Sequence, residues 1–483
     1  MRSLPLALIA TTAVIALAAP AGAETLQGAL AKAYDRNPTL TGARAQQRAT
    51  DENVPIQRAA GLPSANVEGS YSENFLAPPN AFTFPSRTVG GTISMSVPIY
   101  QGGAVKNGVR AADARVLAGR ENLRGTESSI FSQVVAAYND VIRDQAVVEL
   151  NQANVRQLAT NLQATGDRFE VGDLTRTDVA QSEARLSLAR GDLHTAEANL
   201  ISSRERYIAL VGDVPVNLEP PPPLPNLPGT PDQAVEIAVR DNPDLLAAER
   251  NREAARFDVR AAEAGTRPKL SAFAQGQYQN YLGTLGSGII GAGVAQQSSQ
   301  AAAGLSAQVP LFQGGRPGAQ VRQAQARQSQ ALEQVIAAER SVVQQVRAAY
   351  ASWRSSQEVI RSAESAVSAN RLSLEGVRAE NSVGNRTIIE ILNAEQELLN
   401  AQVQLVTARR NAYVAAFTLL AAMGQAEARD LNLEGVTLYD PTVNYRRVRN
   451  SIWDYAKDPE PQTVATRTVD TPAQNPETSA KPQ

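Results

Sequence analysis

Apolar residues recur at every seventh position along two consecutive stretches of the chain. Such spacing over four heptads indicates a coiled-coil seam, so each stretch is predicted to be a long helix with one dry stripe. The first seam consists of Val134, Val141, Val148, Val155 and Leu162, and the second of Val179, Leu186, Leu193, Leu200 and Tyr207. A companion stripe of mixed character predicts a partly wet flank, suited to a wall with water on both sides. Its residues are Ala137, Asp144, Asn151 and Leu158.

The two predicted helices form a hairpin, residues 104–212, that turns at Gly172. No proline interrupts residues 105–168, so the first helix could extend about 95 Å at 1.5 Å per residue. That length is roughly three times the ~30 Å hydrocarbon core of a bilayer. Gly172 stands in Val-Gly-Asp, where the chain must reverse. Glycine readily adopts the left-handed conformation found at helix ends.

The whole unit occurs twice. Residues 97–212 align with 309–424 at a constant offset of 212, without a gap, so a second hairpin at 316–424 turns at Gly384. Further upstream, the dipeptide Asn37-Pro38 matches Asn242-Pro243 at an offset of 205, with small insertions in between. A repeat of this length is a duplicated structural unit and not a solenoid period. The seams of the second copy consist of Val346, Trp353, Ile360, Val367 and Leu374, then Ile391, Leu398, Leu405, Ala412 and Leu419.

Upstream of each hairpin the apolar period falls to two residues, which is the period of a β-strand. The predicted strands are residues 67–75 and 88–100 in the first copy, and 270–281 and 301–312 in the second. Their lengths are close to the 9–11 residues of a tilted strand that crosses a bilayer. Pro98 and Pro310 are predicted to end their strands, because proline cannot donate to a ladder.

Four strands per chain are too few for a membrane barrel. An open sheet edge is not tolerated in lipid, and outer-membrane barrels begin at about 8 strands. Several chains are therefore expected to share one barrel, with 8 strands from two chains or 12 from three. The fold class predicted from the residues is mainly α-helical with transmembrane β-structure and an internal duplication.

The remaining segments divide the chain. Residues 1–23 are predicted to be a secretory signal peptide, with Arg2, an apolar run and a small-residue cleavage site ending at Ala23. An uncleaved N-terminal anchor is the alternative. The first repeat then spans 24–213, a proline-rich stiff linker 214–231, and the second repeat 232–424. Residues 425–483 have no counterpart, and their composition beyond 457 predicts disorder.

Composition removes several function classes. The chain has no cysteine, which excludes disulfides, thiol catalysis and a lipid anchor on cysteine. Its net charge of −2 becomes −3 once Arg2 leaves with the signal, and no basic stripe suggests a nucleic-acid partner. The only histidine, His194, cannot make a zinc site alone. Residues 286–291 match the glycine-rich dinucleotide fingerprint, but they lie between predicted strands without a following helix, so no nucleotide site is expected there. No cofactor, metal or catalytic residue is predicted.

Two segments next to the hairpin turns are specific enough to suggest a family. Residues 382–394 read Ser-Val-Gly-Asn-Arg-Thr-Ile-Ile-Glu-Ile-Leu-Asn-Ala, and residues 171–179 are their first-copy partner. With the strand pairs and the signal, the chain resembles the TolC family of outer-membrane export channels over residues 24–440. The resemblance implies a homotrimer whose 12-stranded barrel lies in outer-membrane lipid and continues as a helical tunnel across the periplasm. It also implies docking of a membrane-fusion adaptor and an inner-membrane transporter, either an ABC or a proton-driven one.

The resemblance further implies roles for residues near the tips. Asp178 and Arg386 match the charged pair that locks the periplasmic tip, and Thr177 matches their neighbour. Glu390 and Asn393 match two acidic positions that line the narrowest constriction, although the second is an amide here. Gly172 and Gly384 mark the tips at which the adaptor docks.

The resemblance favours an exit duct for efflux or type I secretion, and two other classes remain open at this point. A periplasmic coiled-coil adaptor without a pore is one, although adaptors usually have one hairpin and a lipoyl-like β domain. An outer-membrane enzyme on a barrel scaffold is the other, although no polar catalytic cluster is visible on the strands. The cargo is not readable from the residues.

Overall fold

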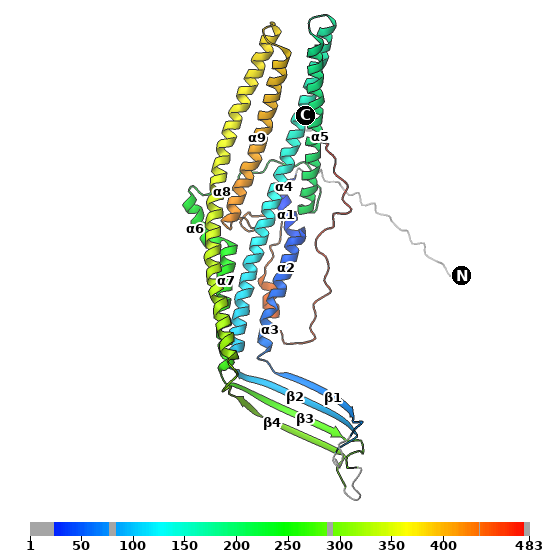
Figure 1. Cartoon of the computed structure of the whole chain (residues 1–483), viewed down its shortest axis with the longest axis vertical. Coiled ribbons are helices and arrows are strands. Elements are labelled where there is room, and N and C mark those ends of the chain that lie inside the picture. Colours follow the sequence, from blue (N-terminus) through cyan, green and yellow to red (C-terminus); the bar gives the residue numbers. More distant parts are fainter. Residues whose placement is uncertain (1–23, 77–83, 287–292, 434, 478–483) are drawn as a thin grey trace, which may run out of the picture.

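Two helical hairpins dominate the computed structural model, which describes residues 24–76, 84–286, 293–433 and 435–477. Their long first helices extend about 100 Å each. The hairpin tips lie at one end of the elongated chain and a β-sheet lies at the other (Figure 1). The first hairpin is α4 (Ala104–Glu170) with α5 (Arg176–Val211), and the second is α8 (Arg316–Ser382) with α9 (Ile388–Ala422).

The predicted seam residues Val134, Val141 and Val148 are buried between helices. The companion stripe was predicted to be partly wet. That prediction is wrong, because Asp144 and Asn151 are each only 6% exposed. The cause is that α4 packs along both α5 and α9, which leaves little of its surface to solvent along this stripe. The polar groups are satisfied there, since Asp144 accepts from Arg143 at 2.8 Å and Asn151 donates to a backbone carbonyl at 2.8 Å.

The sheet has the antiparallel order β1-β2-β3-β4, so β1 and β4 are its edge strands. Pro98 does not end its strand as predicted, because β2 continues to Gln101 with a register shift between Pro98 and Tyr100. Beyond Ser96, β2 has no β1 residue beside it, so the missing N–H of Pro98 leaves no ladder bond unmade on that side. The strands are β1 (Ser64–Glu73), β2 (Arg87–Gln101), β3 (Lys269–Asn280) and β4 (Gln297–Gln308).

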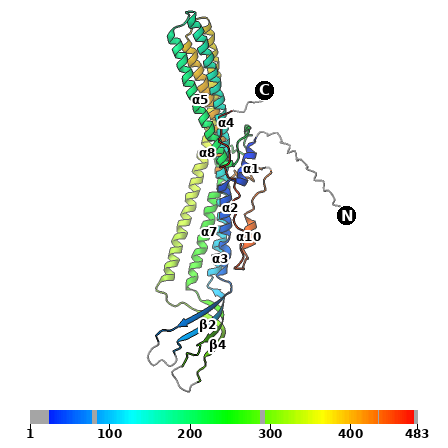
Figure 2. The same cartoon turned by 90° about the vertical axis from the view of Figure 1, so that its right-hand side faces the viewer.

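Shorter helices lie beside the long ones, from about their middle to the end near the sheet (Figures 1 and 2). The duplicated Asn-Pro motif explains their attachment. Asn37 caps α2 and donates to the Leu210 carbonyl at 2.9 Å, and Asn242 caps α7 and donates to the Ala422 carbonyl at 2.9 Å. Each asparagine thus joins two short helices to the end of a hairpin. These helices are α1 (Leu26–Arg36), α2 (Pro38–Asp51), α3 (Asn53–Ala59), α6 (Pro231–Asp241), α7 (Pro243–Glu263) with a 3-10 turn (Ala264–Thr266), and α10 (Thr442–Val448).

The C-terminal segment follows the outside of the helices. Residues 457–477, for which composition suggested disorder, form an extended segment that reaches α5. Arg204 donates to the carbonyls of Asn475 and Glu477, and Glu205 accepts from the Gln474 backbone at 3.1 Å. Side chains of α5 therefore supply hydrogen-bond partners for the backbone of this tail. Among the described residues, no helix is both long and apolar enough to cross a bilayer.

Glu127 joins α4 to the segment after α9, because its carboxylate accepts from the Ala428 backbone at 2.6 Å. Burial raises the pKa of Glu127 to about 7. The folded chain therefore holds this proton more tightly than the unfolded chain, and stability falls as pH rises from about 4.5 to 7. The variant Glu127→Gln keeps an acceptor without the charge. We expect it to be more stable at pH 8 by about 2 kcal/mol.

Denaturant unfolding at pH 5 and pH 8 measures this effect. Glu127→Gln is expected to lose most of the difference between the two pH values. Glu149→Gln, which changes an exposed carboxylate on the same helix, serves as the control. An unchanged pH dependence in Glu127→Gln would contradict the assignment.

Candidate gate at the hairpin tips

Both hairpins turn through the same backbone motif. In the first, Gly172 has φ +86° and the Asp173 N–H donates to the Arg168 carbonyl at 2.9 Å. In the second, Gly384 has φ +79° and the Asn385 N–H donates to the Glu380 carbonyl at 2.9 Å. These contacts close a Schellman motif, which satisfies the last carbonyls of the first helix in each hairpin.

A capping box starts the second helix of each hairpin. Thr175 and Asp178 cap α5 reciprocally, and Thr387 and Glu390 do the same for α9. Asp178 and Glu390 occupy the same position of the repeat, 212 residues apart. The sequence signal for this role is a threonine followed three residues later by an acid, which was not used above. Both carboxylates therefore have a structural task before any role in gating.

The caps also set the charge state of these carboxylates. Hydrogen bonds from Thr175 lower the pKa of Asp178. The Thr387 backbone N–H, followed by Arg386 and the Thr387 hydroxyl, lowers the pKa of Glu390 to about 2. Both groups are consequently ionised throughout the neutral range.

Arg386 is held by its own hairpin. Its guanidinium lies 2.6 Å from Glu380 and 2.6 Å from Glu390, and its carbonyl accepts from Asn381 at 2.7 Å. No ion pair joins Arg386 to Asp178 within the described chain, where Asp178 bonds to Thr175. The exposed Thr177 makes no side-chain hydrogen bond there either. The latch that the resemblance implies is therefore absent from a single chain and remains a prediction for contacts between chains.

Asn393, which the resemblance assigns to the constriction, contacts the neighbouring hairpin. Asn393 on α9 accepts from Arg185 on α5 at 2.6 Å. The contacts around the level that the resemblance assigns to the constriction therefore involve two carboxylates, Glu380 and Glu390, one amide and two guanidinium groups. Glu390 is already paired with Arg386, so the local charge is not acidic.

Glu395 is a residue that sequence reasoning missed. It is 6% exposed, and its carboxylate accepts from Asn161 on α4 at 2.9 and 3.0 Å and from Arg378 on α8 at 2.7 Å. Three helices from both hairpins meet at this one group. The available signal was a single carboxylate on the apolar face of α9, four residues after Ile391 and four before Leu399.

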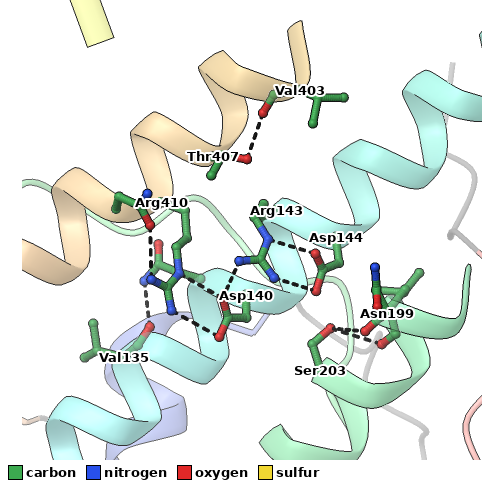
Figure 3. Close-up of polar contacts among 12 residues, drawn as sticks. Val135, Asp140, Arg143, Asp144, Asn199, Ser203, Val403, Thr407 and Arg410 are labelled. Carbon is green, nitrogen blue, oxygen red and sulfur yellow. Dashed lines mark hydrogen bonds and ion pairs between the residues drawn. The ribbon is translucent and has the colours of Figure 1, made fainter. Parts of the chain in front are cut away.

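A second polar link joins the hairpins farther from the tips. Figure 3 shows Arg410 of α9 reaching Asp140 of α4, with contacts of 2.8 and 3.2 Å. Arg143 lies 2.9 Å from the same aspartate and 2.8 Å from Asp144. Together with the Arg185–Asn393 bond, these contacts join the two hairpins of one chain by charge-assisted bonds at three levels. Charge-assisted hydrogen bonds are strong only when donor and acceptor are well aligned, so these contacts fix the hairpins relative to each other.

Between the hairpins lies an open groove of about 900 Å³. Its walls are rich in amide side chains, including Asn151, Asn199, Asn370, Asn400 and Gln404. Within the described ranges, no group of three or more His, Asp or Glu residues is placed to hold a metal ion. Neutral amides offer hydrogen bonds in both directions without fixed charge.

Known proteins share this architecture. A family model described as "Outer membrane efflux protein" matches residues 29–213 and 234–425. The outer membrane efflux protein BepC of Brucella suis is 33% identical over 90% of this chain and 93% of its own length. The outer membrane protein TolC of Escherichia coli is 27% identical over 94% of this chain and 95% of its own. A crystal structure of CusC superposes with a TM-score of 0.71 at 20% identity, covering 83% of this chain and 92% of that one.

Proposed function

Because this chain belongs to the outer membrane efflux protein family, we propose that it is the exit duct of a tripartite efflux or type I secretion system. It is an outer-membrane protein of the TolC type, mainly helical with a sheet region. It performs no chemistry of its own and conducts cargo passively. The periplasmic adaptor without a pore is disfavoured, since that class does not combine two hairpins with paired bilayer-length strands.

The observation that supports a duct most strongly is the open sheet. Strands β1 and β4 each have an outer edge without a strand partner in the described chain. Exposed apolar residues such as Val67 and Leu305, 80% and 69% exposed, suit contact with lipid. An unpaired edge is not tolerated in lipid, so we propose that three chains close one barrel of 12 strands, each adding two hairpins to the tunnel.

Purified protein tests this proposal directly. In a planar bilayer it should give discrete conductance steps, and in SDS without heating it should migrate as a trimer. Heating should convert it to a single-chain species of 51.4 kDa less the signal peptide. A fully folded single chain after extraction, or intact trimers without conductance, would rule the duct out.

The tips suit a docking partner. Val171 and Val383, which precede the turn glycines Gly172 and Gly384, are 80% and 70% exposed. Apolar side chains at the end of a helical pair favour contact with another protein. We propose that a periplasmic membrane-fusion adaptor docks at these tips and connects the duct to an ABC or proton-driven transporter of the inner membrane.

Gating is proposed to occur at the same tips. In a trimer, Asp178 and Thr177 of one chain can face Arg386 of a neighbour, as the family resemblance implies. That contact has to compete with Glu380 and Glu390, which already hold Arg386. An exposed ion pair contributes only about 0–1 kcal/mol, so we propose that the latch is weak here and that buried links within the chain contribute most of the closure.

The constriction formed by Glu390 and Asn393 is expected to bind cations weakly. A trimer would place three carboxylates there, each paired with Arg386, and Arg185 lies beside each amide. Replacing Asn393 by aspartate adds three carboxylates. We expect the concentration of a trivalent cation needed to block conductance to fall about tenfold, which is about 1.4 kcal/mol.

Two further variants separate the charges. Asn393→Gln keeps the neutral amide and should leave block unchanged. Arg185→Gln combined with Asn393→Asp removes the cation that would otherwise pair with the new carboxylate, and should strengthen block further. Equal block in all variants would contradict the assignment of these residues to the pore.

A further inference from the structure

The backbone nitrogen of Glu24 lies in a pocket made by the linker between the repeats. It is 3.2 Å from the Val216 carbonyl oxygen and 3.2 Å from the Asn217 carbonyl oxygen. Asn217 has φ +41°, a left-handed conformation that a non-glycine residue rarely adopts. This turn directs two successive carbonyls at one nitrogen. A peptide N–H has a single proton for these two acceptors.

The other backbone groups of Glu24 are also held by hydrogen bonds. The residue is 9% exposed and forms a parallel bridge with Leu218. Its carbonyl accepts from the Glu219 N–H at 3.1 Å and from the Tyr138 hydroxyl at 2.8 Å. The first described residue is therefore built into the junction of α4 and the linker.

The charges around Glu24 do not balance. Its carboxylate lies 2.8 Å from the Lys32 ammonium, which also lies 2.9 Å from Asp213. Glu219 lies close enough to act on Tyr138, and Arg36 close enough to act on Asp213, so three acids and two bases leave this cluster with a net charge of −1. The Tyr207 hydroxyl, beside Tyr138, is buried and lies near the Glu24 carboxylate. The cluster thus lacks one positive charge.

We infer that the mature chain begins at Glu24 and that its α-ammonium is the missing group. Hydrolysis of the Ala23–Glu24 bond by a signal peptidase consumes one water. It leaves a carboxylate on Ala23 and an amine on Glu24, which takes up a proton at neutral pH. The ammonium brings the cluster to neutrality. It offers one proton to each of the Val216 and Asn217 carbonyls and retains a third for another acceptor in the pocket.

Processing therefore completes the fold as well as releasing the chain. The new charge fastens the start of the linker, residues 214–219, to the first repeat, and the linker sets where the second repeat begins. Before cleavage the cluster keeps its unbalanced charge, so we infer that the linker docks firmly only after the signal is removed. This inference concerns assembly of the chain and does not depend on the proposed duct.

Intact mass and N-terminal sequencing of protein purified from the outer membrane give the first test. Glu24 is the expected first residue, and any other first residue would overturn the inference. The second test inserts one asparagine between Ala23 and Glu24. The cleavage site ending at Ala23 is retained, but the ammonium moves one residue away and Glu24 regains a peptide N–H.

Hydrogen–deuterium exchange of residues 214–219 measures how firmly the linker is bound at the Glu24 nitrogen. At pH 7 the insertion variant should exchange about tenfold faster there, because charge-assisted bonds are lost. Residues 171–176 at the first hairpin tip serve as the internal control and should not change. Equal exchange of 214–219 in the two proteins would overturn the inference.

The pH dependence gives an independent readout. A free α-amino group titrates near pH 7.7–8.0, and bonds to the charged form delay its loss of a proton. Protection of 214–219 should therefore be present at pH 7 and decline toward pH 9.5, after correction for intrinsic exchange, and only without the insertion. The groups that face the nitrogen or its cluster are Glu24, Lys32, Arg36, Tyr138, Tyr207, Asp213 and Glu219. Parallel pH profiles in the two proteins would refute a titrating ammonium.

Discussion

Replacing Gly424 by alanine is expected to destabilise the chain by about 3 kcal/mol or more. Gly424 ends α9 with φ +74°. A Cβ there would lie 2.4 Å from the Asp241 carbonyl oxygen and 3.0 Å from the Asn242 Cα. Both obstacles are backbone atoms of the Asn-Pro junction, which Asn242 ties to Ala422. They cannot rotate away as a side chain can, so the junction itself must move.

Gly384 provides the matched control, because its φ of +79° is nearly the same and a Cβ added there would meet no atom within 4 Å. Gly384→Ala should therefore lower the free energy of unfolding only by the strain of a left-handed alanine, about 1–2 kcal/mol. Thermal and denaturant unfolding of the two variants isolates the steric part. Equal losses of stability would show that the close approach at Gly424 does not constrain the fold.

Replacing Glu395 by alanine is expected to give the largest change in conductance. The carboxylate joins Asn161, Arg378 and α9 in one buried contact. Its removal leaves Arg378 half exposed and hydrated, and leaves Asn161 without its acceptor. The lost bonds to a charged group are worth about 1.5–3 kcal/mol. If they favour a closed tip, the open population should rise about tenfold to a hundredfold.

Single-channel recording measures this change. Glu397→Gln is the control, since Glu397 is an exposed carboxylate two residues along the same helix. Glu395→Gln should give an intermediate result, because an amide can still accept a hydrogen bond but no longer balances Arg378. Unaltered conductance and open time in intact Glu395→Ala trimers would exclude this residue from gating.

The local features of the fold could be predicted from the residues. The heptad seams predicted the long helices, and the duplication at an offset of 212 predicted two hairpins. Turns at Gly172 and Gly384 followed from glycine at a helix end, and the structure shows the left-handed φ at both. Family membership followed from the same segments and is confirmed by the family model. All these features depend on residues close together in sequence.

The candidate gate was predictable only in part. Asp178, Arg386, Glu390 and Asn393 came from the resemblance, and the structure places them in caps and ion pairs within their own chain or hairpin. Glu395 was missed because a carboxylate on a helix has the same local sequence pattern whether solvent or another helix covers it. Strand β2 continues past Pro98, which was predicted to end it, since Pro98 is tolerated where β1 is absent.

By itself, the sequence determined the helices, the turns, the strand pairs and their duplication, because hydrophobic period and glycine act over a few residues. The tertiary structure alone decided which polar groups are buried. Asp144 and Asn151 lose water because α4 packs along both α5 and α9, and Glu395 loses water where α4 and α8 supply its partners. Likewise Gly384 and Gly424 are alike in backbone conformation, yet only Gly424 meets another backbone. Burial is a property of what lies opposite a residue, and that neighbour can be hundreds of positions away.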